Sequence, residues 1–301
     1  MTPRPARVAF IGLGAMGQRV AGRLLGAGYA LRVWNRTASK AEGLVARGAA
    51  LASTPAGAAR GADLVITMVA DPAALRDVSQ GADGIAGGVA AETTLMEMST
   101  VGPFAVAQLS SALPPAARLI DAPVLGSLAE AENGTLTILV GGDGQVVERW
   151  TPLLRALGRP IHIGPVGAGA AAKLVANSAL LSVIVALGEA LALADALGLA
   201  RDKAYEVLAA TPLAAQAERR RPSIEAGDYP PRFKLALAAK DAALITDVAS
   251  TSETDLRVAD AARAWLVDAD RIGFGDRDYT AVLAHILRQR KSGPSGRTPP
   301  G

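Results

Sequence analysis

Residues 8–20 read VAFIGLGAMGQRV, a short apolar run followed by a glycine-rich turn and a helix-like segment. In a strand–turn–helix unit of this kind, Gly12 permits the tight turn, Gly14 lets the backbone approach a pyrophosphate, and Gly17 allows helix to pack on strand. The helix N-terminus then directs unpaired N–H groups at the phosphates. The stretch predicts dinucleotide binding, with a tight turn that holds no ligand as the alternative. The predicted cofactor contacts here are Gly12, Leu13, Gly14, Ala15, Met16 and Gly17.

The end of the second predicted strand, residues 30–34, bears on which cofactor binds. NAD-binding folds usually place Asp or Glu there to hold the ribose 2′-hydroxyl. Here the strand leads into Asn35, Arg36 and Thr37, with no acid. An Arg can pair with a 2′-phosphate, and a Thr can donate a hydrogen bond. We therefore expect NADP(H) to be preferred and NAD(H) to be usable, unless Arg36 is simply a solvated loop residue.

Further apolar runs have the length and continuity of strands in a parallel sheet that is buried on both faces. They are residues 64–69, 94–98, 118–120, 135–140 and 160–163. Ligands of such sheets bind outside the carboxyl ends of the strands. The residues expected around one crevice at these ends are Met68, Val69, Ala70, Ser99, Thr100, Gly126 and Ser127.

Residues 164–199 read GPVGAGAAAKLVANSALLSVIVALGEALALADALGL, which is apolar on nearly all sides. This composition predicts a long helix buried on most faces. Its length approaches that of a transmembrane span, but Lys173 and Asn177 at one end and Glu189 and Asp195 at the other favour a core helix. Lys173 and Asn177 lie one turn apart on the same face. Because a buried lysine is costly unless it is paired or used, Lys173 is a candidate functional residue.

Beyond this run strand character is lost, and helices are expected over residues 202–210, 214–225, 235–250, 254–269 and 279–290. The predicted fold class is therefore α/β, with an N-terminal Rossmann-type dinucleotide-binding domain, a long interdomain helix and an all-α C-terminal domain. The predicted boundaries are residues 1–163, 164–199 and 200–290 for these parts, the last serving substrate binding and oligomerisation. Residues 291–301 are polar and rich in Gly and Pro, which predicts a flexible tail.

The composition argues against several other classes of protein. The chain has 301 residues and a net charge of +3 with interspersed charges and no nucleic-acid-binding motif, so no nucleic acid partner is expected. It has no Cys and only two His, His162 and His285, so neither a thiol nucleophile, a metal site nor a Ser–His triad is expected. The N-terminus lacks the apolar run of a signal peptide, which makes a cytoplasmic location the default expectation, and no membrane association is predicted.

Several separated motifs resemble those of the β-hydroxyacid dehydrogenases, the family of 3-hydroxyisobutyrate dehydrogenase and of the glyoxylate/succinic semialdehyde reductases. The resemblance extends over residues 8–286. The motifs are IGLGAMG at 11–17, DAPV at 121–124 continuing to AENGTLTILVGG, GAGAAAKLVAN at 167–177, and Phe233 with Lys240-Asp241.

The resemblance implies an NADPH-dependent oxidoreductase that transfers a hydride between nicotinamide and a small aldehyde acid or hydroxy acid. Lys173 would be the catalytic general acid/base, and Asn177 would orient the substrate. Thr100 and Lys240 would contact the cofactor near the nicotinamide. The predicted substrate-binding residues are Ser99, Leu125, Gly126, Ser127 and Phe233. The predicted partners are a small-molecule substrate and further copies of the chain, in a homodimer or homotetramer with the helical domain in the interface.

The sequence departs from the family pattern near the expected substrate. Leu125 stands where a carboxylate-binding Ser is usual, Ser127 replaces a commoner Gly, and Ala176 replaces the first Asn of a usual pair. Ala70-Asp71 stand where Pro-Asn is common. The identity of the substrate, the direction of the reaction and the subunit number therefore stay open. An imine reductase is an alternative, although Asp or Tyr usually replaces the lysine there, and a non-catalytic binding protein that kept the fold is another.

Overall fold

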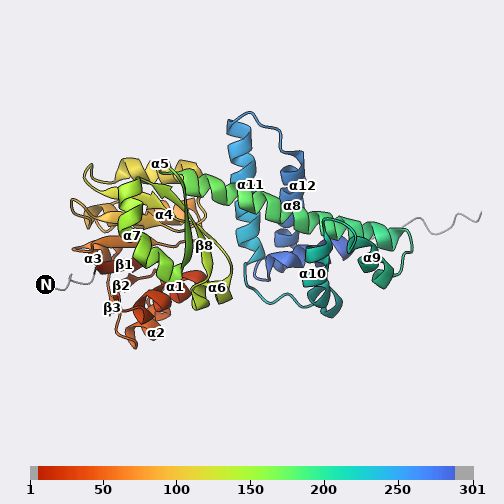
Figure 1. The fold of residues 1–301 in the computed structure, drawn as a ribbon, viewed down its shortest axis with the longest axis horizontal. Coiled ribbons are helices and arrows are strands. Elements are labelled where there is room, and N and C mark those ends of the chain that lie inside the picture. Colours follow the sequence, from red (N-terminus) through yellow and green to blue (C-terminus); the bar gives the residue numbers. More distant parts are fainter. Residues whose placement is uncertain (1–5, 289–301) are drawn as a thin grey trace, which may run out of the picture. The chain divides into compact units, whose positions relative to one another are not determined.

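The first part of the chain is built on a nine-stranded sheet, seen in a computed structural model that describes residues 6–288 (Figure 1). The strands are β1 (Arg7–Ile11), β2 (Ala30–Trp34), β3 (Ala50–Leu51), β4 (Leu64–Thr67), β5 (Thr94–Glu97), β6 (Arg118–Asp121), β7 (Val124–Leu125), β8 (Leu136–Gly142) and β9 (Gly158–Gly164). Their order is β3-β2-β1-β4-β5-β6-β8-β7, and β9 pairs with β8. Strands β1 to β6 are parallel, whereas β8 runs antiparallel to β6 and β7. The first six strands thus have the order of the doubly wound dinucleotide-binding fold, which confirms the predicted fold class.

The helices of this part connect successive strands and cover the sheet. They are α1 (Ala15–Gly26), α2 (Glu42–Val45), α3 (Pro55–Ala59), α4 (Pro72–Ser79), α5 (Gly102–Ala112), α6 (Leu128–Asn133) and α7 (Gly144–Leu157), with 3-10 turns η1 (Ala38–Ala41) and η2 (Ile85–Gly87). Side chains of β1 alternate between two buried clusters, Val8 and Phe10 in one and Ala9 and Ile11 in the other. The first cluster includes residues of α1, α6 and α7, and the second includes residues of α3, α4 and α5. Both faces of the sheet are therefore covered, as its continuous apolar strands require.

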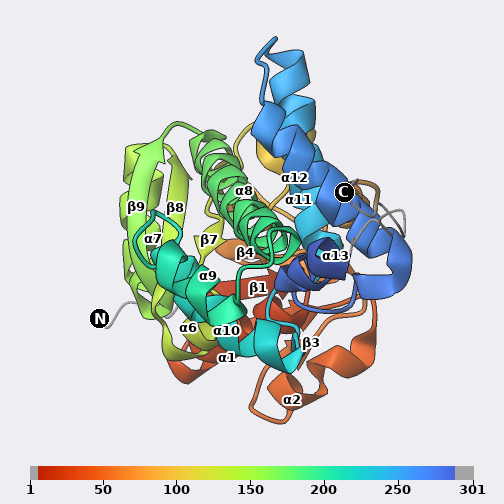
Figure 2. The same cartoon turned by 90° about the vertical axis from the view of Figure 1, so that its right-hand side faces the viewer.

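The rest of the described chain is helical. Its helices are α8 (Ala168–Ala196), α9 (Arg201–Leu208), α10 (Ala214–Ala226), α11 (Leu235–Thr251), α12 (Arg257–Ala269) and α13 (Val282–Arg288), with η3 (Asp270–Phe274) and η4 (Tyr279–Ala281) as short additional turns. The chain divides into two compact units, Met1–Ala176 and Asn177–Gly301, so the division falls within α8. In the second unit α11 and α12 lie side by side (Figure 2).

The structure differs from the sequence expectation mainly at element ends. Strands β3 and β7 were not predicted, because two residues are too few to show a periodic pattern. The long helix occupies residues 168–196 instead of 164–199: Gly167 and Gly198 have φ values of +93° and +71°, outside the right-handed helical region. The last predicted helix is split into η4 and α13, and residues 289–290 together with the predicted tail 291–301 lie outside the described residues.

The expectation that the long helix is buried on most faces is wrong for the chain taken alone. One stripe of α8 is buried, with Leu181, Ile184 and Leu191 at most 2% exposed. Other apolar side chains of α8 face solvent, and Val175 and Leu193 are 73% and 60% exposed. Among residues 6–288, α8 is the one helix long and apolar enough to cross a membrane, a test that core helices of soluble proteins also pass. One buried stripe is the pattern of a helix that packs against its own chain on one side.

Candidate functional site

The turn after β1 is held closed by contacts within the first unit. Gly12 has φ = +99°, and a Cβ there would lie 2.2 Å from the carbonyl oxygen of Met68. A Cβ on Gly17 would lie 2.1 Å from the carbonyl oxygen of Gly12. The Gly12 N–H also donates to the Trp34 carbonyl at 3.0 Å. These two glycines are therefore required by the packing of the protein itself.

Gly14 is different, because the packing of the protein does not require a glycine there. It precedes α1 with φ = −68°, which any residue can adopt, and no side chain caps the helix. Apart from its chain neighbours, no atom of the described residues lies within 4 Å of a Cβ built on Gly14. The open space above the N-terminus of α1 fits a phosphate-bearing ligand that approaches the backbone closely.

The loop after β2 is tied to the glycine turn by Asn35. Its Oδ1 accepts a hydrogen bond from the Leu13 N–H at 2.8 Å, and its Nδ2 donates to the Thr37 carbonyl at 2.9 Å. The neighbouring Arg36 is exposed and borders a pocket of about 430 Å³. The residues that line this pocket are Trp34, Asn35, Arg36, Ala38, Leu51, Ala52 and Ser53. The structure thus gives Asn35 a positioning role and makes Arg36 one of the residues that line a pocket of ligand size.

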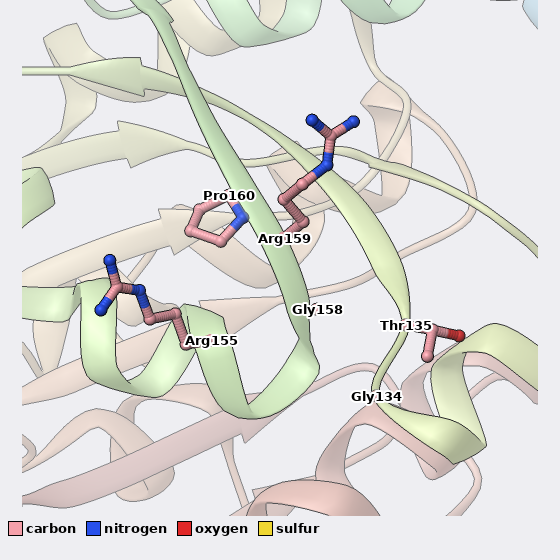
Figure 3. Close-up of a pocket in the computed structure, with 6 residues that line it drawn as sticks. All are labelled: Gly134, Thr135, Arg155, Gly158, Arg159 and Pro160. Carbon is pink, nitrogen blue, oxygen red and sulfur yellow. The ribbon is translucent and has the colours of Figure 1, made fainter.

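A second pocket, of about 510 Å³, contains none of the predicted cofactor-binding, substrate-binding or catalytic residues. It is lined by Gly134, Thr135, Arg155, Gly158, Arg159 and Pro160 (Figure 3). The two arginine side chains, Arg155 and Arg159, point away from one another and do not converge on a common position (Figure 3). We assign no function to this pocket.

The loops after β4 and β5 are joined through a buried carboxyl group. The Val69 N–H donates to Ser99 Oγ at 2.8 Å, and the Ser99 N–H donates to Glu97 Oε1 at 2.5 Å. The Thr67 hydroxyl donates to the other carboxyl oxygen of Glu97. Burial raises the pKa of Glu97 to about 7, against the opposing effect of hydrogen bonds from Ser99 and Thr67. Ser99 is only 5% exposed and its hydroxyl is engaged in this network, so its contact with substrate stays a prediction.

The helix that carries Lys173 is fixed at its start by Asp121, the last residue of β6. The Asp121 carboxylate accepts hydrogen bonds from the N–H groups of Gly167 and Ala170 at 2.7 and 2.6 Å. Burial raises the pKa of Asp121, and these backbone hydrogen bonds oppose the shift. Lys173 itself is half-buried, and its Nζ donates to the Val124 carbonyl at 2.8 Å. The lysine nitrogen therefore lies beside β7, directly before the predicted substrate-binding residues 125–127.

Those residues form a tight connection into α6. Gly126 has φ = +131°, a conformation that favours glycine. The N–H and hydroxyl of Ser127 both donate to the Glu130 carboxylate, at 2.7 and 2.6 Å. Ser127 therefore caps the start of α6, a role that the sequence analysis did not assign to it. Leu125 is half-buried and offers no side-chain hydrogen-bond donor at the position where the family usually has Ser.

In the second unit, Asn177 and Lys240 meet at one buried acid. Asn177 Nδ2 donates to Asp241 Oδ2 at 2.6 Å, and Lys240 Nζ lies 2.6 Å from Asp241 Oδ1. Asn177 and Asp241 are each 2% exposed, so Lys240 and Asp241 are not a solvated pair on a helix surface. The predicted contact of Lys240 with the cofactor is not tested by this geometry and stays a prediction.

Phe233, the remaining predicted substrate-binding residue, lies before α11 and is half-buried. Its ring packs against that of Tyr279 with centroids 5.4 Å apart, and its N–H donates to Asp278 at 3.1 Å. These contacts give Phe233 a place in the packing of the second unit. They neither support nor oppose its predicted contact with substrate.

The sequence did not indicate a role for Glu97, Asp121 or Asp241, although each is buried and accepts hydrogen bonds. Glu97 and Asp121 end apolar strands, and Asp241 follows a lysine that was singled out. An acid at the buried end of a parallel strand is a signal that could have been used, because burying a carboxylate requires hydrogen-bond donors nearby.

The matches to known proteins cover residues 7–286, almost all of the described chain. Residues 7–167 match the family model described as the NAD binding domain of 6-phosphogluconate dehydrogenase, and residues 167–286 match the model described as NAD-binding of NADP-dependent 3-hydroxyisobutyrate dehydrogenase. Glyoxylate/succinic semialdehyde reductase 1 of Arabidopsis thaliana is 33% identical over 94% of this chain and 99% of its own length. The 3-sulfolactaldehyde reductase of Escherichia coli K12 is 34% identical over 93% of this chain and 96% of its own.

A solved structure of 3-hydroxyisobutyrate dehydrogenase from Mycobacterium tuberculosis, determined with L-serine, superimposes with a TM-score of 0.83. It is 28% identical to this chain, and the match covers 95% of this chain and 100% of that one. The similarity therefore includes both the nucleotide-binding unit and the helical unit.

Proposed function

Because this chain belongs to the β-hydroxyacid dehydrogenase family and is an NAD(P)-dependent oxidoreductase, we propose that it uses NADPH to reduce a small aldehyde acid to the hydroxy acid. The observation that carries the proposal is the position of Lys173, whose Nζ lies 2.8 Å from the Val124 carbonyl at the edge of the 125–127 turn. A cationic donor held by the backbone beside a turn of this kind suits an acid that acts on a carbonyl oxygen.

The glycine turn and Arg36 are the residues that would hold the cofactor. Gly14 offers the open backbone over the N-terminus of α1, and Arg36 offers a guanidinium beside the pocket at the end of β2. When bound, the nicotinamide cofactor supplies the hydride. As the carbonyl carbon gains hydride, negative charge grows on the oxygen; the Lys173 ammonium stabilises that charge and donates the proton that completes the alcohol. The bond to the Val124 carbonyl limits the positions that the ammonium can take during this transfer.

The substrate class follows from the relatives and from Leu125. Glyoxylate, succinic semialdehyde and 3-sulfolactaldehyde, which the relatives' names give, are all aldehydes that carry an anionic group. Leu125 lacks the hydroxyl that usually binds the carboxylate at this position, so we propose a substrate with an apolar portion next to its carbonyl. Imine reduction is the second candidate, favoured by the apolar Leu125 and opposed by Lys173. Initial rates with NADPH across aldehyde acids, ketones and cyclic imines separate the two.

Replacing Arg36 with alanine tests the preference for NADPH. If the guanidinium pairs with the 2′-phosphate, the variant should bind NADPH about 1.5–3 kcal/mol more weakly, the value of a hydrogen bond to a charged group, and bind NADH almost as before. Fluorescence titration of each cofactor measures the two dissociation constants. Arg76→Ala removes an exposed arginine from α4 and serves as the matched control. An equal loss for both cofactors in Arg36→Ala would mean that Arg36 does not contact the phosphate.

We also propose that the chain forms a homodimer or homotetramer. Exposed apolar side chains along α8, such as Val175 and Leu193, support this, because a neighbouring subunit would remove them from water. Sedimentation equilibrium at micromolar concentration should give a mass of at least twice 30.6 kDa. A monomer at that concentration would contradict the proposal.

A further inference from the structure

The contacts of Glu97 extend beyond its own strand. Thr67 and Glu97 are paired residues at the ends of the parallel strands β4 and β5. The carboxyl of Glu97 receives the Thr67 hydroxyl on one oxygen and the Ser99 N–H on the other, and Ser99 Oγ in turn receives the Val69 N–H. One buried side chain therefore links the residues that follow two strands.

We propose that Glu97 is a positioning residue that holds the loops after β4 and β5 in the arrangement that binds the cofactor. The proposal rests on the proposed function, because Met68, Val69, Ala70 and Thr100 are the cofactor contacts expected in these loops. Glu97 itself is 1% exposed and acts through Ser99 and Thr67.

The contact of the β4 loop with the glycine turn extends this role. The Met68 carbonyl oxygen occupies the place where a Cβ on Gly12 would lie, at 2.2 Å, and the Met68 N–H donates to the Ile11 carbonyl at 2.9 Å. A shift of the β4 loop therefore displaces atoms packed directly on the turn expected to bind pyrophosphate. Burial of the carboxyl without its donors would be costly, so the donors and the loop positions depend on one another.

The charge of Glu97 gives the network a dependence on pH. Burial, with a smaller contribution from the nearby Asp121 on the paired strand β6, raises the pKa of its carboxyl from the ordinary value of 4.5 to about 7, against the hydrogen bonds from Ser99 and Thr67. A carboxylate accepts from Ser99 and Thr67 together, whereas a protonated carboxyl has one fewer acceptor position. Protection of the loop amides should therefore increase as pH rises through 7.

The effect on global stability has the opposite sign. Because the pKa of Glu97 is higher in the folded protein than in the unfolded chain, the folded protein binds more protons between about pH 4.5 and 7. The contribution of Glu97 to stability is fully present below pH 4.5 and is lost as pH rises through about 7. Asp121, whose pKa is also raised by burial, contributes in the same direction. Glu97→Gln should remove the part that is due to Glu97.

Amide hydrogen exchange of the unliganded protein tests the positioning role directly. In Glu97→Gln, the amides of Val69 and Ser99 should exchange at least about tenfold faster than in the wild type, whereas the amides of β2 should be unchanged. The protection of both amides, corrected for intrinsic exchange, should depend on pH between 6 and 8 in the wild type and not in the variant. Glu148→Gln removes an exposed acid from α7 and is the matched control. Wild-type exchange at Val69 and Ser99 in folded Glu97→Gln would overturn the proposal.

A second variant and a second readout keep the result interpretable. If Glu97→Gln does not fold, Thr67→Val removes one donor and should raise exchange at the same two amides by a smaller factor; no change there overturns the proposal. Titration with NADPH should give a dissociation constant about tenfold higher in Glu97→Gln. Faster exchange without weaker NADPH binding would overturn the link to the cofactor. A wild-type protein that binds no nicotinamide cofactor would overturn the proposed function instead, and the exchange rates would still decide whether Glu97 positions the loops.

Discussion

Lys173→Ala is expected to lower the turnover number by about 10²–10⁴, the usual contribution of a positioned proton donor. The affinity for NADPH should be almost unchanged, because the expected cofactor contacts of the glycine turn do not involve this side chain. The effect should be seen at saturating substrate, since the lost step is transfer of a proton to the carbonyl oxygen. Steady-state kinetics on the best aldehyde acid measures it, and Lys203→Ala, which removes an exposed lysine from α9, is the control.

The same variant separates a catalytic lysine from a structural one. One hydrogen bond of Lys173 goes to the Val124 carbonyl, and losing a hydrogen bond that involves a charged group costs about 1.5–3 kcal/mol. A lysine that balanced a buried acid would instead cost about 3–5 kcal/mol when removed, because the acid would be left unpaired. Thermal unfolding of the variant distinguishes the two. Near-normal turnover with the best carbonyl substrate would contradict the proposed mechanism, and imine reduction would become the better hypothesis.

The nucleotide-binding fold could be predicted from the sequence because the patterns that indicate it are local. The apolar run before Gly12 and the spacing of the three glycines determine a strand, a turn and a helix within about 20 residues. The strands that follow are continuous apolar runs, which are typical of parallel strands buried on both faces of a sheet. Strand β7 could not be predicted, because its two residues are defined by pairing with β8 and not by any local pattern.

The residues of the candidate site could be predicted from the sequence better than the hydrogen bonds that hold them in place. The motifs indicated Lys173 and Asn177, but no pattern indicates that Asp121 holds the start of their helix or that Asn177 donates to Asp241. Such bonds join residues 46 to 64 positions apart, so they depend on the tertiary fold. Ser99 and Ser127 illustrate the same point: both were expected to donate to substrate, and the structure shows their hydrogen bonds to Glu97 and Glu130.

The apolar composition of α8 also had two meanings that the sequence alone could not separate. A helix that is apolar all round can be surrounded by its own chain or by a second copy. Leu181, Ile184 and Leu191 are buried by the chain, whereas Val175 and Leu193 are not. Periodicity shows which residues share a face, but it does not show what covers that face.

Gly12→Ala is expected to lose mainly folding stability, and Gly14→Ala is expected to lose mainly cofactor affinity. In Gly12→Ala the new Cβ must adopt φ = +99° and lie 2.2 Å from the Met68 carbonyl oxygen. Backbone strain and overpacking each cost about 1–3 kcal/mol, so the variant should lose roughly 2–6 kcal/mol of folding stability. Gly14→Ala keeps an ordinary φ and, apart from its chain neighbours, meets no described atom within 4 Å, so it should lose only about 0.5–1 kcal/mol, the difference between Gly and Ala at an N-cap.

For cofactor affinity the informative variant is Gly14→Ala, because its new methyl group occupies the space that the pyrophosphate is expected to enter. Overpacking of about 1–3 kcal/mol against the ligand corresponds to a loss of roughly 5- to 150-fold in NADPH affinity, in a protein that melts close to the wild type. Calorimetric titration measures the NADPH affinity of each variant, and thermal unfolding measures its folding stability. If Gly14→Ala binds NADPH normally, the open space above α1 is not where the phosphates lie. If Gly12→Ala melts normally, its carbonyl neighbour can move aside, and the turn is less constrained than its glycine implies.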